Sequence, residues 1–260
     1  MMAVACGPAA ALAQAPTTVR LEDLTWTELR TLIRAGKTTV IVPVGGVEQS
    51  GPDMALGKHD ARVRYLAERI ARSLGNAIVA PVVSYVPEGT IEPPTGHMAF
   101  PGTITIPPEV FRQTLESAAM SFKLHGFRDV VFLGDHGGYQ MDLKAVADDL
   151  NHHWVKSPAR AHFIPQYYRA TQTTYVAALR ARGYSLAQIG THAGLADTAL
   201  TLAIDPQMVR AQRIRTGGRL SLADGVHGDP TGATAALGEI GVNAIIRETT
   251  KAIQIAVARP

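Results

Sequence analysis

The chain has 260 residues, of which 46% are hydrophobic and 18% are charged. Its single cysteine, Cys6, excludes an intramolecular disulfide and argues against a cysteine nucleophile in the folded domain. The formal net charge of +3 is scattered along the chain, which argues against a nucleic-acid-binding protein, and no apolar run is long enough to span a membrane. We therefore expect an ordinary enzyme that acts on a small-molecule substrate.

The N-terminal segment 1–15 is uncharged and rich in alanine, valine and glycine. It resembles the apolar core and small-residue cleavage site of a secretory signal. Cutting after Ala13 is favoured over cutting after Ala15, because Pro16 follows Ala15. We expect export to the periplasm or the extracellular space, with residues 16–260 forming one domain. A disordered N-terminal extension is the alternative.

Helical and strand patterns alternate along the rest of the chain. Thr25 and Glu28 form a capping box that begins the first predicted helix, and Gly36 ends it. Short apolar runs predict buried strands over 38–44, 77–83, 130–133 and 160–165. Helical spacing predicts helices over 25–35, 60–74, 109–124, 140–153, 173–182, 196–204 and 233–253. This alternation predicts an α/β fold with a mostly parallel sheet covered on both faces.

One long segment, 87–108, is rich in Pro, Gly and Thr and is predicted to be a loop. Long loops within compact domains are usually functional.

Polar residues follow two of the predicted strands. Glu48 and Asp53 come after the first strand, and Asp135 and His136 come after the third. Ligands bind beyond the carboxyl ends of the strands in an open parallel sheet, so we expect these side chains to approach one another.

Two further polar groups precede predicted helices. His59 and Asp60 come before the second helix, and His192 and Asp197 come before the helix at 196–204. Asp60 and Asp197 could equally be helix N-caps. Clustered His, Asp and Glu side chains suit Zn²⁺, Mn²⁺ or a similar divalent ion. No phosphate-binding loop and no G-x-S-x-G elbow is present, which argues against a nucleotide-binding protein and an α/β-hydrolase.

Five segments together carry a family resemblance. They are Val-Pro-Val-Gly-Gly-Val-Glu-Gln-Ser-Gly-Pro (42–52), His-Met-Ala-Phe-Pro-Gly-Thr-Ile (97–104), Gly-Asp-His-Gly-Gly (134–138), His-Ala-Gly (192–194) and Gly-Val-His-Gly-Asp-Pro (225–230). In this order they resemble motifs of the creatininase amidohydrolase family, over about residues 20–255. The resemblance implies a three-layer α/β/α sandwich, typically assembled as a homo-hexamer. It also implies cleavage or formation of C–N bonds in small amides by two divalent ions, often Zn²⁺ or Mn²⁺.

The same resemblance assigns roles to individual residues. It implies that Glu48 and His136 are metal ligands and that Asp60 is the bridging ligand, with His59 as a rival. His192 corresponds to a histidine that assists proton transfer. His97 would come from the loop that covers the substrate.

The sequence also departs from the family pattern. Ser50 stands where the family has a histidine ligand, and Gly138 or Leu195 stands where it has an acidic ligand. The second metal ion has therefore lost its expected ligands, so the chain would hold two ions, one or none. Four side chains could replace these ligands or form hydrogen bonds to the remaining ones: Asp53, His59, Asp135 and Asp197.

These departures lead to two hypotheses for function. The first is a metal-dependent amidohydrolase acting on a C–N bond of a small molecule other than creatinine, with Ser50, Gly137 and Gly138 at the substrate. The alternative is an exported small-molecule binding or assembly protein on a degenerate form of the fold.

Overall fold

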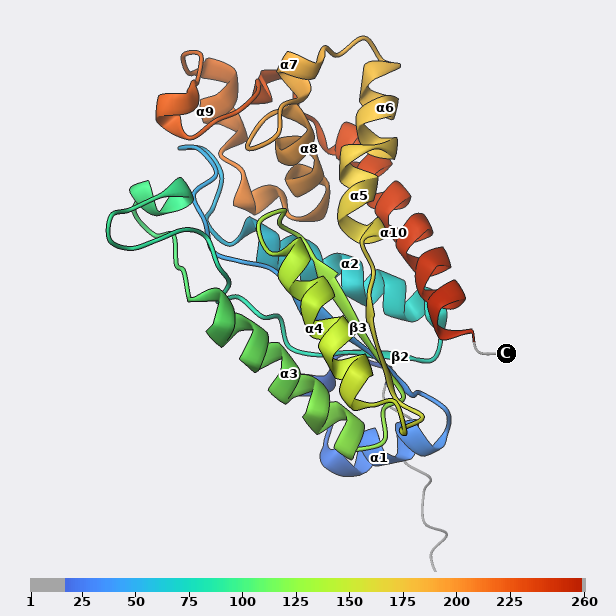
Figure 1. Cartoon of the computed structure of the whole chain (residues 1–260). Helices are drawn as coiled ribbons and strands as arrows, with labels where there is room; N and C mark the ends of the chain where they lie inside the picture. The colour runs from blue at the N-terminus through green and yellow to red at the C-terminus, as the bar shows by residue number, and fades with distance from the viewer. Residues whose placement is uncertain (1–16, 259–260) are drawn as a thin grey trace, which may run out of the picture.

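The computed structural model describes residues 17–258, which are coloured in Figure 1. The predicted signal segment at 1–15 lies outside these residues. No helix within the described part of the chain is long and apolar enough to cross a membrane.

Four strands form one parallel sheet in the order β2-β1-β3-β4. The strands are β1 (Thr39–Val44), β2 (Ala77–Val79), β3 (Asp129–Gly134) and β4 (Arg160–Phe163). The register pairs Val44 with Gly134, so β1 and β3 end side by side. Whatever follows these two strands is brought to the same edge of the sheet.

Ten α-helices occur within residues 17–258. They are α1 (Trp26–Arg34), α2 (Lys58–Leu74), α3 (Pro108–Leu124), α4 (Gln140–His153), α5 (Gln166–Gln172), α6 (Thr174–Arg180), α7 (Leu186–Ile189), α8 (Leu195–Ile204), α9 (Ala211–Thr216) and α10 (Ala235–Val257). Figure 1 shows α3 and α4 on one side of the sheet and α2 and α10 on the other.

Two hydrophobic cores lie on opposite faces of the sheet, because successive side chains of a strand point in opposite directions. Val40 and Phe132 pack with α3 and α4, whereas Ile41 and Val131 pack with α2, α5, α8 and α10. Both central strands are buried along their whole length. The predicted α/β fold with three layers is therefore confirmed.

Most predicted elements are confirmed, including the capping box between Thr25 and Glu28. The second strand is shorter than predicted and ends at Val79. Three short helices of seven, four and six residues, α5, α7 and α9, were not predicted. Helix α2 begins two residues before the predicted start, so Asp60 lies inside its first turn and Gly57 is the N-cap.

The contact between α8 and α10 depends on a glycine. A Cβ atom on Gly238 would lie 1.9 Å from the carbonyl oxygen of Ala199. We expect Gly238→Ala to destabilise the fold by about 1–3 kcal/mol, because overpacking outweighs the gain in helix propensity. Thermal unfolding would measure the loss. Gly218→Ala, where a Cβ would meet nothing within 4 Å, is the control and should be nearly neutral.

Candidate metal centre

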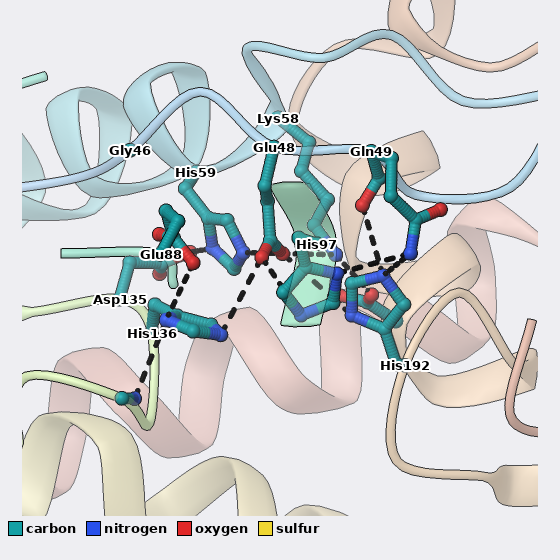
Figure 2. A network of polar contacts seen from close by, with 12 residues as sticks. Gly46, Glu48, Gln49, Lys58, His59, Glu88, His97, Asp135, His136 and His192 are labelled. Atoms are coloured by element: carbon teal, nitrogen blue, oxygen red, sulfur yellow. Dashed lines mark hydrogen bonds and ion pairs between the residues drawn. The ribbon is translucent and has the colours of Figure 1, made fainter. Parts of the chain in front are cut away.

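Four side chains that can bind a metal ion converge beyond the carboxyl ends of the strands. They are Glu48, Glu88, His97 and His136, and each offers one ligand atom within 4.8 Å of the others. Glu48 and His136 follow β1 and β3, while Glu88 and His97 come from the long loop before α3. Figure 2 shows the two imidazoles and the Glu88 carboxylate gathered around Glu48.

Both carboxylates in this group are buried and only partly satisfied. The side chains of Glu48 and Glu88 are both fully buried. The Oε2 atom of Glu48 and both carboxylate oxygens of Glu88 have no hydrogen-bond partner. Burying a polar oxygen without a partner is costly, so these atoms are suited to a cation.

The protonation of the group also suits a metal ion. Burial, followed by the charge of Glu48, raises the pKa of Glu88 to about 9, so Glu88 keeps its proton at neutral pH when no cation lies beside it. Burial lowers the pKa of His136 to about 3 and also lowers the pKa of His97, which keeps both imidazoles neutral. Two carboxylates and two neutral imidazoles are a donor set that divalent transition-metal ions accept.

A second group of buried side chains lies directly behind Glu48. Three cationic and three acidic side chains alternate in a closed circuit, which we call the charge ring. Its members in order are Glu48, His59, Asp135, Arg62, Asp197 and Lys58. Glu48 therefore belongs to both groups, with Oε1 facing the charge ring and Oε2 facing Glu88, His97 and His136.

His59 links two carboxylates of the charge ring. Its Nε2 is 2.7 Å from Glu48 Oε1, and its Nδ1 is 2.6 Å from Asp135 Oδ2. Carboxylate oxygens can only accept, so both ring nitrogens donate and the imidazole is positively charged. Burial opposes that charge, but Glu48 and Asp135 outweigh it and raise the pKa of His59.

The other cations of the charge ring close the circuit. Lys58 Nζ lies 2.5 Å from Asp197 Oδ2 and 3.6 Å from Glu48 Oε1. Arg62 Nη2 donates to Asp135 Oδ2 at 2.6 Å, and its Nη1 donates to Asp197. Burial alone would raise the pKa of both aspartates, but these cations lower it below the usual range.

The local backbone explains why the charge ring needs its carboxylates. Lys58, His59 and Arg62 lie near the N-terminus of α2, where the helix dipole disfavours positive charge. Asp197 is in the first turn of α8, and its Oδ2 accepts the N–H of Ala193 at 2.9 Å. Ala193 has a left-handed φ of 52°, which is unusual for a residue other than glycine. The turn before α8 thus holds Asp197 against the cations of α2.

His192 lies beside these groups with a defined orientation. Its Nε2 donates to the carbonyl oxygen of Gln49 at 2.9 Å, which leaves Nδ1 unprotonated at 3.6 Å from Glu48 Oε1. Burial, followed by the charge of Lys58, lowers the pKa of His192 to about 4. The imidazole is therefore neutral at pH 7 and has a free lone pair.

A cavity of about 120 Å³ opens next to His136 and the charge ring. Charged and polar residues line one part of it, and Tyr175, Val176 and Leu200 line another. His136, His192 and Gly137 all reach this cavity, so a small molecule bound there would lie next to the candidate metal centre.

Three other residues predicted to belong to the site lie outside the group of four possible metal ligands. Asp60 lies outside the group of four, and its Oδ1 accepts the N–H of Gly46 at 2.9 Å. Asp53 pairs with Arg213 of α9 at 2.9 Å. Ser50 is buried and lies at a different small cavity, which Asp53 also lines.

The remaining predicted residues lie around the centre. Gly138 donates its N–H to His136 Nδ1 at 3.3 Å, and Gly137 lines the cavity. Asp135 and Asp197 are members of the charge ring, and the predicted N-cap role of Asp197 is wrong because Gly194 is the N-cap of α8.

The position of Asp60 gives a direct test of its role. We expect Asp60→Ala to keep the full metal content, because its carboxylate accepts the N–H of Gly46 and lies outside the group of four ligands. The loss of this one hydrogen bond should cost about 1 kcal/mol of stability. Elemental analysis of the purified variant would check this, and a protein stripped of metal would show that Asp60 is a ligand.

Sequence reasoning missed Glu88, Lys58 and Arg62. Glu88 follows the second strand. Because ligands bind beyond the carboxyl ends of parallel strands, Glu88 could have been predicted for the same reason as Glu48 and His136. Lys58 and Arg62 could have been noticed as positive charges at the wrong end of a helix.

The fold and the site together define a class of protein: a parallel α/β/α protein with clustered carboxylates and imidazoles that could bind a metal ion at the carboxyl edge of the sheet. The family model described as "Creatininase: Creatinine amidohydrolase" matches residues 22–253. The chain therefore belongs to the creatininase family.

Individual relatives agree with this family. A mycofactocin precursor peptide peptidase of Mycolicibacterium smegmatis is 28% identical over 221 residues, which cover 77% of this chain and 78% of that protein. The creatinine amidohydrolase of Pseudomonas putida is 27% identical over 114 residues, 44% of this chain and 43% of that one. A crystal structure of creatininase superposes with a TM-score of 0.78 at 21% identity, over 94% of this chain and all of that one, which shows a shared fold.

Proposed function

We propose that this protein is a metal-dependent hydrolase that cleaves a C–N amide bond in a small molecule. The observation that carries the proposal is the group of Glu48, Glu88, His97 and His136, whose unsatisfied carboxylate oxygens converge beside a cavity. A divalent ion held by these residues would lower the pKa of a bound water and polarise an amide carbonyl. Membership of the family and the amidohydrolase among the relatives support the choice of reaction.

The chain's own residues suit the proton transfers of this reaction. Hydrolysis consumes one water and yields a carboxylic acid and an amine, so one proton must move from the water to the leaving nitrogen. His192 can accept that proton at Nδ1, because Gln49 fixes its tautomer and its lowered pKa keeps it neutral. Both His192 and His136 line the cavity, which places the proton acceptor within reach of a bound substrate.

Metal content and hydrolysis measured together test this proposal. The full chain would be stripped with a chelator, reloaded with Zn²⁺ or Mn²⁺, and analysed for bound metal. The reloaded protein would then be assayed for amine release from small cyclic amides, linear amides and short peptides. The peptides are included because one relative is named a peptidase. Bound metal with turnover of any of these amides is the expected result.

Two other outcomes would contradict the proposal. A protein that retains no metal but binds a small ligand would instead be the binding protein considered as the alternative. A metal-bound protein that cleaves no amide would have a different reaction.

Export and self-assembly stay predictions. Mass spectrometry of the mature N-terminus would test cleavage after Ala13, and light scattering would test the expected homo-oligomer.

A further inference from the structure

We propose that the charge ring limits this protein to a single divalent ion, bound by Glu48, Glu88, His97 and His136. The inference rests on the proposed function, because it concerns the number of ions at the same site. The reason for a single ion is that hydrogen bonds and ion pairs already use most of the possible ligand atoms around Glu48.

The charge ring uses the donor atoms that face away from the candidate metal centre. Glu48 Oε1 contacts His59 at 2.7 Å and Lys58 at 3.6 Å, so positive groups already surround it. Both nitrogens of His59 donate to carboxylates, which leaves no lone pair on the ring for a metal ion. Glu48 can therefore bind an ion through Oε2, which accepts no hydrogen bond and faces the imidazoles of His97 at 3.2 Å and His136 at 3.5 Å.

The acidic members of the charge ring are occupied as well. Asp135 Oδ2 accepts from His59 and Arg62, and its Oδ1 accepts from Tyr167 at 2.7 Å. Asp197 accepts from Lys58 through one oxygen and from Arg62 through the other. Neither aspartate offers an unpaired oxygen, so neither replaces a missing ligand.

The charges of the ring balance without a metal ion. Three cationic side chains face three carboxylates, and all six are buried or nearly so. A second divalent cation placed among Lys58, His59 and Arg62 would meet uncompensated repulsion at low local dielectric. Within residues 17–258, only the group containing Glu88 has three or more His, Cys, Asp or Glu side chains close enough to bind an ion.

The first test is the metal stoichiometry of the wild-type chain. Chelator-stripped protein would be titrated with Mn²⁺ by calorimetry, and the bound ion would be examined by electron paramagnetic resonance. We expect saturation at one equivalent and the signal of an isolated Mn²⁺ ion. Two tight equivalents with a spin-coupled signal would overturn the inference and leave the proposed hydrolase intact. No bound ion at all would overturn the proposed function itself.

The second test changes the charge ring. His59→Asp leaves two cations facing four carboxylates, a net charge of −2 that one divalent ion would neutralise. The shorter side chain also vacates space between Glu48 and Asp135. We expect this variant to bind a second equivalent, more weakly than the first.

A matched control distinguishes an effect of the charge ring from the effect of adding an aspartate anywhere in the protein. His152→Asp makes the same substitution at an exposed position on α4 and should keep one equivalent. Circular dichroism would establish that both variants fold. A folded His59→Asp variant that still binds one ion would show that the ring does not set the limit. If that variant does not fold, the wild-type stoichiometry and resonance signal still decide the inference.

Discussion

Glu48→Gln should abolish tight metal binding and reduce hydrolysis to background. The substitution removes the charge that faces Glu88, His97 and His136, and we expect metal affinity to fall at least about 100-fold. It also removes one of the two carboxylate partners of Lys58 and of His59, which then keep only Asp197 and Asp135. Leaving a buried charge wholly unpaired costs about 3–5 kcal/mol, and the retained aspartates reduce that cost, so the folded state should be destabilised by less than this amount.

Three measurements on this variant separate the effects. Elemental analysis gives metal content, amine release gives activity, and denaturant titration of the metal-free protein gives the free energy of unfolding. Glu239→Gln, which changes an exposed glutamate on α10, should leave all three as in the wild type. A Glu48→Gln protein with normal metal content would remove Glu48 from the centre and contradict the assignment.

The fold could be predicted from the sequence because its signals are local. The apolar runs at β1 and β3 are too short for helices and are buried on both faces, so their type and burial followed directly. Thr25 and Glu28 satisfy each other within one helical turn. One helix that was missed, α7 (Leu186–Ile189), is a single turn whose stability comes from packing and from its capping box.

The candidate site was only partly predictable, because the charge ring depends on contacts between distant segments. Glu48 and His136 could be found since both directly follow strands. The partners of Lys58 and Arg62 could not be found, because Asp197 lies more than 130 positions along the chain. His59 and Asp60 are neighbours at the start of α2, and only the orientation of the helix decides which one faces Glu48.

Glu88→Gln should weaken metal binding as Glu48→Gln does but have the opposite effect on stability. Glu88 has no cationic partner in the charge ring, and both its oxygens lack hydrogen bonds. Its folded-state pKa of about 9 lies above the ordinary value of 4.5, so the metal-free protein loses stability as the pH rises between these values. A neutral amide removes that penalty and should stabilise the metal-free fold by on the order of 2 kcal/mol at pH 7.

The pH dependence makes this prediction specific. The difference in unfolding free energy between Glu88→Gln and the wild type should grow from pH 6 to pH 8, measured by denaturant titration without metal. Glu92→Gln, an exposed glutamate in the same loop, should show no such difference. A Glu88→Gln protein that is less stable than the wild type at every pH would mean that Glu88 has a stabilising partner. Glu88 would then not be buried without a partner, and the strongest physical reason for a cation at this site would be lost.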